Sequence, residues 1–536
     1  MMHRKHDLAV AATILISASA FPAATATAQT LPTNVPVLAR IWTLGMDSSR
    51  TYPLAQALMD SIGPRLTGTP QQKAGNDWLV ATYTKWGIPA RNEQYGTWRG
   101  WRRGITHIDL LSPRVRSLEG TMLAWSPGTK GAISGPAIML PDFASNTDYE
   151  RWLPQAKGKY VLVSMPQPTC RPDTTWAASA TAESYTRMKD ERTKANTAWQ
   201  QRVLRTGGGP DSTYALANRN LAVKLENAGA LGVITNYWSA GWGVDKVFNA
   251  RTTKVPTLDL SCEDYGLVAR LAEHAQSPVL RVDAESQALG EVPVFNTIAT
   301  IRGSEKPDEY VLLSAHFDSW DAGSGATDNG TGTITMLEAM RILRQVYPKP
   351  KRTIVVGHWS GEEQGLVGSR AFAADHPEIV KGLQAQFNQD NGTGRIVFIS
   401  TSGLVGASAN FAGWLSKLPA ELTRNFTTVS FPGSPSSGGS DNASFICYGA
   451  PAFNLGSLSF DYGVYTWHTN RDTFDKIVFD DLKSNATLVA MLTYLASEDP
   501  TTVPRDRRIM PPTSAGAPGE WPTCQSPPRK SSDSTR

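Results

Sequence analysis

Imidazole and carboxylate side chains follow an apolar run of the chain, where they could bind a divalent metal ion. In residues 311–330 an apolar run leads to His316 and Asp318, and a Gly-rich stretch then leads to Asp328. Such a run indicates a buried parallel strand, and sites in open α/β sheets form outside the carboxyl ends of the strands. A His and two Asp at this edge could hold a metal ion.

Three later stretches supply further groups of the same kind. Glu362 and Glu363 come where a strand-like run turns into a helical one. Asp390 follows a short apolar run, and His468 lies in an aromatic, polar loop. Each has a plainer interpretation when taken alone. A Glu-Glu pair is usually a solvated first turn of a helix, an Asp before Asn-Gly often caps a turn, and a single loop His is more often structural.

Taken together, these residues form a set of two imidazoles and three carboxylates: His316, Asp328, Glu363, Asp390 and His468. Such a set suits two zinc ions, with one carboxylate bridging and an open position on each ion. Two ions about 3.5–4 Å apart lower the pKa of a shared water and stabilise a tetrahedral oxyanion. A free carboxylate beside them is then needed as general base. Manganese or cobalt could replace zinc at these ligands.

The elements that must position these residues alternate along residues 293–500. The patterns predict strands at 309–315, 353–359, 385–389, 396–400 and 451–455, and helices at 331–346, 363–375, 409–417, 440–448 and 481–497. This alternation predicts an α/β fold with a mostly parallel sheet sandwiched by helices. Residues 29–120, with helix, turn, helix and strand patterns, are expected to begin the same domain.

Between these parts, residues 121–292 have short strand patterns and one polar helical stretch at about 177–206. This block resembles a protease-associated domain, so we expect an inserted, β-rich module; a generic β-rich insertion is the alternative. Residues 501–536 are rich in Pro, Ser and Gly. This composition predicts a flexible C-terminal tail, apart from any tie made by Trp521 or Cys524.

Residues 1–28 resemble a secretory signal, with a basic start, an apolar stretch and Ala26-Thr27-Ala28 as the cleavage site. The alternative is a retained anchor. No later segment is apolar enough to span a bilayer, so we expect a secreted or periplasmic protein with no stable membrane insertion after cleavage. A net charge of +4 is too balanced to indicate nucleic acid or an anionic membrane as the main partner.

Four cysteines, Cys170, Cys262, Cys447 and Cys524, allow three disulfide pairings in an exported protein, and the sequence does not choose among them. None has the C-x-x-C spacing of a cysteine zinc site. Cys447 lies in an apolar helical pattern and is expected to be a packed core thiol.

One series of motifs is, in chain order, H-x-D, G-A-x-D-N, G-E-E-x-G-L-x-G-S, Asp and His. This series resembles the two-zinc exopeptidases of metallopeptidase family twenty-eight. That family contains bacterial leucyl aminopeptidases, glutamate carboxypeptidases and carboxypeptidase Q. The run HFDSWDAGSGATDNG, the following Glu-Glu-Gln-Gly and the insertion look closest to the carboxypeptidase Q branch. The resemblance covers most of residues 50–497.

The resemblance implies a role for each site residue. Asp328 bridges the two metals, His316 and Asp390 complete one site, and Glu363 and His468 complete the other. Glu362 is the general base that activates the bridging water and returns the proton to the leaving amine. Asp318 orients His316 through its second ring nitrogen, as outer carboxylates do at metal sites.

The sequence therefore predicts an exported two-zinc exopeptidase that hydrolyses dipeptides or short peptides. An aminopeptidase acting on longer peptides is one alternative, and a non-catalytic binding relative of the same fold is another. A one-zinc acyltransferase of the glutaminyl cyclase type is the third, although the full ligand set and the large insertion argue against it. The resemblance also allows a homodimer. Tyr462 or Tyr465 could donate a hydrogen bond to the oxyanion.

Overall fold

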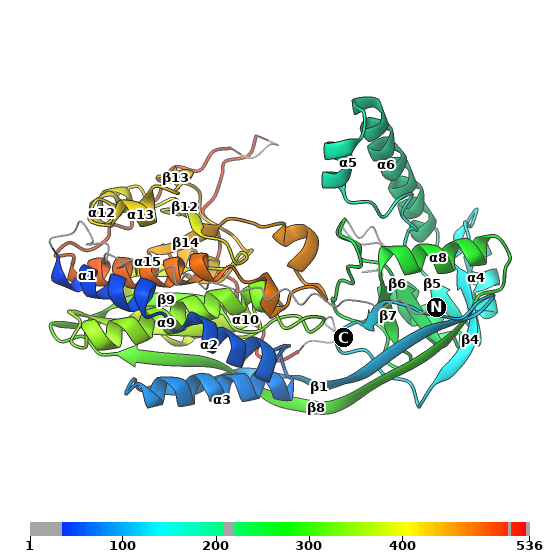
Figure 1. Cartoon of the computed structure of the whole chain (residues 1–536), viewed down its shortest axis with the longest axis horizontal. Helices are drawn as coiled ribbons and strands as arrows, with labels where there is room; N and C mark the ends of the chain where they lie inside the picture. The colour runs from blue at the N-terminus through cyan, green and yellow to red at the C-terminus, as the bar shows by residue number, and fades with distance from the viewer. Residues whose placement is uncertain (1–34, 208–218, 513–515, 532–536) are drawn as a thin grey trace, which may run out of the picture. The chain divides into compact units, whose positions relative to one another are not determined.

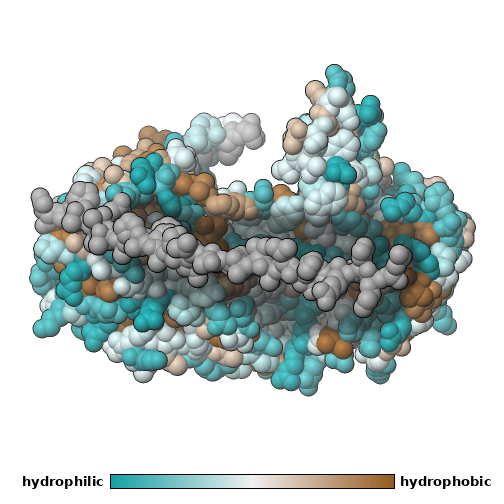
Figure 2. All heavy atoms as spheres, viewed as in Figure 1, coloured by the Kyte–Doolittle hydropathy of each residue, from teal (hydrophilic) through white to brown (hydrophobic). Residues whose placement is uncertain are grey.

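The computed structural model describes residues 35–207, 219–512 and 516–531, all within the unit Thr33–Arg536. The predicted signal segment, residues 1–28, lies outside the described residues. No helix among the described residues is long and apolar enough to cross a membrane. On the face seen in Figure 2, hydrophilic and hydrophobic residues are interspersed, as on most protein surfaces.

Four parallel strands form the centre of the peptidase part of the sheet. In spatial order they are β14 (Ala452–Ser457), β11 (Leu383–Asn388), β9 (Lys306–His316) and β10 (Arg352–Trp359). β12 (Ile396–Ser400) and β8 (Val279–Ile301) flank them antiparallel. The predicted α/β fold with a mostly parallel sheet is confirmed, because the apolar runs at all five predicted strand positions form strands.

Helices between these strands cover the sheet (Figure 1). α9 (Thr331–Val346) and α15 (Phe479–Glu498) pack on each other and against β9, and most residues of both are buried. α10 (Val367–Asp375) packs against β10 and against α14 (Ala443–Ile446). α10 begins later than the predicted helix at 363, which leaves Glu362 and Glu363 in a turn.

Residues 121–292 are a mixed α/β region rather than a β-rich one. β4 (Ile133–Met139), β5 (Tyr160–Leu162), β6 (Gly232–Thr235) and β7 (Thr257–Leu260) pair in parallel. α6 (Ala182–Leu204) and α8 (Cys262–Glu273) lie in the same region. Its relation to protease-associated domains stays a prediction. We call residues 121–292 the insertion.

Two long strands connect the insertion with the rest of the sheet. β1 (Ala90–Ser112) pairs antiparallel with β8 along almost its whole length, and β8 also pairs with β4 and β10. The expected boundary at 292/293 therefore falls inside a strand. A strand that continues from one part into the other has no turn signal that could mark a boundary between them.

The expectation for Cys447 was wrong, because it is bonded to Cys524, and Cys170 is bonded to Cys262. The tail is tied at Trp521, as the sequence allowed, because the indole donates to Ile446 O at 2.9 Å. A further contact was not expected: Thr97 N donates to Arg529 O at 2.9 Å. The residues that hold the tail lie 75 or more residues away from it in sequence, so local composition could not indicate them.

Candidate metal centre

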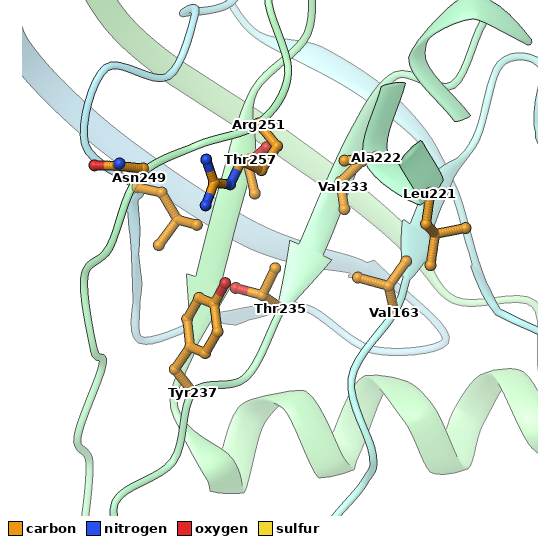
Figure 3. A pocket seen from close by; sticks show the side chains of 10 residues that line it. Val163, Leu221, Ala222, Val233, Thr235, Tyr237, Asn249, Arg251 and Thr257 are labelled. Atoms are coloured by element: carbon orange, nitrogen blue, oxygen red, sulfur yellow. The ribbon is translucent and has the colours of Figure 1, made fainter. Parts of the chain in front are cut away.

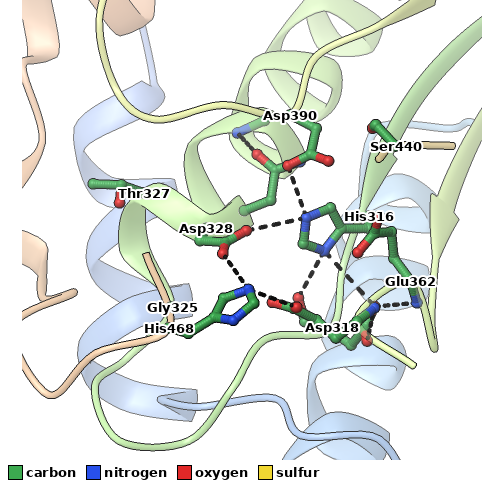
Figure 4. A network of polar contacts seen from close by, with 12 residues as sticks. His316, Asp318, Gly325, Thr327, Asp328, Glu362, Asp390, Ser440 and His468 are labelled. Atoms are coloured by element: carbon green, nitrogen blue, oxygen red, sulfur yellow. Dashed lines mark hydrogen bonds and ion pairs between the residues drawn. The ribbon is translucent and has the colours of Figure 1, made fainter. Parts of the chain in front are cut away.

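The ends of three neighbouring strands bring the predicted site residues together (Figure 4). His316 is the last residue of β9, and Asp390 follows β11 by two residues. Glu363 lies in the turn after β10. Because these strands are adjacent and parallel, their carboxyl ends meet at one edge. Asp328, in the segment η4 (Ala326–Gly330) before α9, and His468, in a loop after η5 (Tyr462–Thr466), complete the set.

Asp328 lies between the two imidazoles. Its Oδ1 is 3.3 Å from His316 Nε2, and its Oδ2 is 3.3 Å from His468 Nε2. Asp390 Oδ1 is 3.0 Å from His316 Nε2, and Glu363 Oε2 is 2.9 Å from His468 Nε2. These contacts connect all five predicted ligands into one cluster, with Asp328 facing both halves of it.

The ligand atoms form two overlapping groups in which all lie within 4.8 Å of one another. One group contains His316, Glu362 and Asp390, and the other contains His316, Asp328 and Glu363. Glu362, assigned by the resemblance as a base, is itself a member of the first group, so its carboxylate is placed to reach a water held there. His468 joins the second group through Glu363 and Asp328.

The carboxylate of Asp318 holds the glutamate turn more closely than it holds His316. It accepts hydrogen bonds from Glu362 N at 3.1 Å and from Glu363 N at 3.3 Å. His316 Nδ1 is 3.0 Å from the main-chain oxygen of Asp318 but 3.8 Å from its carboxylate. The expected orientation of the ring through Asp318 thus runs mainly through the backbone carbonyl.

Burial and charge strongly shift the pKa values of the cluster. Burial raises the pKa of Glu363 to about 7 and holds that of Glu362 well above its usual value. Burial lowers the pKa of His468, but the charges of Glu363 and Asp328 outweigh it and raise it to about 9. For His316, burial is likewise outweighed by Asp390 and Glu362, so its pKa is raised. Crowded groups that compete for protons are suited to a divalent cation, which takes the protons' place.

The donor set fits such a cation. The side chains of the five residues are between 1% and 9% exposed. Glu363 Oε1 is buried and accepts no hydrogen bond from any residue that the structure describes. A buried carboxylate oxygen without a donor is costly unless a cation or a water completes it.

Two residues that sequence analysis missed hold the backbone around Asp328. Asp472 accepts hydrogen bonds from Thr327 N at 2.7 Å and Asp328 N at 3.0 Å. Arg65 is fully buried and donates to the main-chain oxygens of Phe317 at 2.7 Å and Gly325 at 2.8 Å. In the sequence, the only signs of these two residues were a second Asp shortly after His468 and an Arg within IGPRLTGTP. Neither pattern is specific enough to predict a role.

The insertion contacts the loop that carries His468, residues 462–473, which we call the His468 loop. Val247 N donates to His468 O at 2.8 Å, and Ser239 Oγ donates to Val464 O at 2.7 Å. The Phe248 ring meets the His468 ring edge-on, with centroids 5.2 Å apart. The insertion therefore positions one side of the cluster.

A small cavity within the insertion is distinct from the cluster. It lies beside β6 and β7 and is lined by Val163, Val233, Tyr237 and Thr257 among others (Figure 3). It holds about 10 Å³ of space for the centre of a water molecule, which is room for roughly one water. A peptide does not fit there.

Comparisons with known proteins match this part of the chain to a peptidase family. Residues 296–493, which contain all five ligands, match the sequence model of peptidase family M28. Carboxypeptidase Q of Mus musculus is 24% identical over 465 residues, covering 86% of this chain and 88% of the relative. Carboxypeptidase Q of Homo sapiens is 24% identical over 468 residues, with the same coverage.

Solved structures have the same fold. A peptidase M28 precursor from Shewanella amazonensis superposes with a TM-score of 0.63 at 24% identity, covering 89% of this chain and 98% of that chain. A zinc aminopeptidase from Bacillus subtilis gives a TM-score of 0.51 at 20% identity, covering 85% and 96%. Residues 296–493 thus match peptidase family M28 and contain the metal-ligand cluster, and these findings together show that the chain is a metallopeptidase.

Proposed function

We propose that this chain is an exported exopeptidase that carries two zinc ions and hydrolyses dipeptides or short peptides. The observation that carries the proposal is Asp328, with one carboxylate oxygen 3.3 Å from each of two imidazoles. Asp390 and Glu363 each stand beside one of these imidazoles. This arrangement has the form of two three-ligand sites that share a carboxylate.

In this proposal Asp328 would bridge two ions, His316 and Asp390 would hold one of them, and Glu363 and His468 would hold the other. The ions, when bound, lower the pKa of a water molecule and polarise the scissile carbonyl. The protein supplies the fixed geometry: Asp472 and Arg65 hold the backbone that leads into Asp328, and the insertion holds His468.

Glu362 acts as the general base. Its carboxylate takes one proton from the attacking water as the water oxygen bonds to the scissile carbon. It then gives that proton to the nitrogen of the leaving amine as the C–N bond breaks. The same carboxyl group can thus accept the proton in the first step and donate it in the second. Asp318 positions this base by accepting the main-chain N–H of Glu362.

The length of the similarity to carboxypeptidase Q favours a dipeptidase or carboxypeptidase over an aminopeptidase that acts on longer peptides. Two disulfides among the described residues support export, since disulfides form and persist in oxidising compartments. A homodimer stays a prediction from resemblance.

The test is hydrolysis of a panel of free and N-blocked dipeptides by the mature protein, with chelator and then with zinc added back. We expect cleavage of free dipeptides that chelator abolishes and zinc restores, with two zinc ions per chain. A folded protein that neither binds zinc nor cleaves any dipeptide would instead favour a non-catalytic binding relative. Cleavage of N-blocked dipeptides would show that a free amino group is not required.

A further inference from the structure

Lys246, in the insertion, is a buried ammonium close to the metal cluster that the proposed reaction does not use. The residue is 1% exposed, and its Nζ lies 4.4 Å from the centre of the Trp467 ring. Among the described residues, none forms a hydrogen bond or an ion pair with this Nζ. A buried charge without a partner is unfavourable unless a ligand supplies one.

The position of Lys246 is fixed by its backbone. Lys246 pairs with Thr469 in an isolated antiparallel bridge, and its main-chain N–H donates to Asp259 Oδ2 at 3.0 Å. The other oxygen of Asp259 accepts from Thr235 Oγ1 at 2.7 Å and from Tyr237 N at 2.8 Å. The Asp259 carboxylate therefore accepts from donors other than the Lys246 ammonium. The ammonium is left to bind a ligand.

The ammonium and the metal cluster share one aromatic neighbour. The Trp467 ring that contacts Nζ also packs on the His468 ring, with centroids 4.0 Å apart. The negative charge of Asp328 also acts on the ammonium. The Trp467 indole is thus in contact both with Lys246 and with the proposed metal ligand His468.

We propose that Lys246 binds the free C-terminal carboxylate of the substrate. In a dipeptide that carboxylate lies one residue, about 3.8 Å, beyond the scissile carbonyl. A cation at this place attracts a free carboxylate and repels a free amino group, so it selects for the C-terminal end of a peptide. The inference rests on the proposed exopeptidase function and specifies that the enzyme recognises the C-terminus of its substrate.

Burial and nearby carboxylates act on the charge of Lys246 in opposite directions. Burial lowers its pKa to about 8, and Asp259 and Asp328 act to raise it. The face of Trp467 stabilises the ammonium in the absence of substrate.

The test compares the best-cleaved free dipeptide with its C-terminal amide, for wild type, Lys246→Met and Lys246→Gln. The control is Lys254→Met, since Lys254 is an exposed lysine of the same region whose Nζ donates to Asn227 at 2.9 Å. Wild type and control should prefer the free carboxylate at least tenfold in kcat/KM.

Both Lys246 variants should lose 10–100-fold in kcat/KM on the free dipeptide, mainly through KM, as expected for one charge-assisted hydrogen bond. Their activity on the amide and their zinc content should stay within about twofold of wild type. Equal losses on both substrates would mean a structural role and would overturn the inference, as would a wild type that cleaves both equally. No cleavage of either by zinc-loaded wild type would instead refute the proposed function.

Discussion

Asn470 and Asp245 are hydrogen-bonded to each other through both main chain and side chain. Asp245 N donates to Asn470 Oδ1, Asn470 N donates to Asp245 O, and Asn470 Nδ2 donates to Asp245 Oδ2, each at 3.0 Å. This pairing joins the insertion to the His468 loop two residues after a proposed metal ligand. His468 has φ of +61°, a conformation that residues other than glycine seldom adopt, so its backbone needs such support.

Asn470→Ala should therefore weaken metal binding on the His468 side. Loss of the outer contacts of a ligand typically costs 10–100-fold in metal affinity. We expect one zinc ion to leave at a chelator concentration at least tenfold lower than in wild type, while the second ion is retained. Zinc per chain after equilibration with graded chelator measures this.

Asn410→Ala is the matched control, because Asn410 also bonds an Asp side chain, Asp499 at 3.0 Å, but does so outside the His468 loop. It should leave both ions as tightly bound as in wild type. If Asn470→Ala retains both ions like wild type, the insertion does not support His468.

His468→Ala and Asp390→Asn should each empty a different half of the centre. His468 contacts Glu363 and Asp328, whereas Asp390 contacts His316. Each variant is expected to bind one zinc ion tightly and to lose most activity. Metal analysis and cobalt absorption spectra of the two variants should differ, because the remaining ligand sets differ. Two tight zinc ions in His468→Ala would exclude His468 as a ligand.

Glu362→Gln should keep both metals and lose turnover. The substitution preserves size and the Glu362 N–H that binds Asp318, and it removes only the group that accepts the proton. A general base contributes about 10²–10⁴-fold, so kcat should fall by that factor with zinc content unchanged. The exposed Glu305 gives the control variant Glu305→Gln, which should behave as wild type. A Glu362→Gln enzyme with normal kcat would show that another group moves the proton.

The sequence predicted those parts of the molecule that depend on local pattern. The strands that end at His316 and before Asp390 are apolar runs bounded by turn residues, and the helix after Asp328 has helical spacing. Parallel strands also share one edge by geometry, so the convergence of the ligands followed from their order along the chain. These steps need no knowledge of distant contacts.

The contacts that sequence missed join residues that are far apart. Asp245 meets Asn470 and Lys246 meets Trp467 across more than 200 residues, and Cys447 meets Cys524 across 77. Neither charge nor periodicity marks such partners in a single chain. The sequence shows that Asp318 lies close to His316 along the chain, but only the structure shows that its carboxylate mainly holds the glutamate turn.

The imidazole of His358 should make stability depend on pH through burial alone. His358 is fully buried on β10, and its Nε2 lies 2.7 Å from the hydroxyl of Tyr83. Burial lowers the pKa of His358 from 6.5 to about 3. Between these values the unfolded chain binds a proton that the folded chain does not. The stabilising contribution is therefore complete above pH 6.5 and is lost as the pH falls towards 3.

Comparison with His358→Gln isolates this effect, because glutamine is polar but does not titrate in this range. Between pH 6.5 and pH 5 wild type should lose about 2 kcal/mol more of its free energy of unfolding than the variant does. Urea unfolding at both pH values measures the difference. The exposed His274 gives the control His274→Gln, whose pH dependence should match wild type. Equal losses in wild type and His358→Gln would show that His358 is protonated in the folded protein, against the burial seen in the structure.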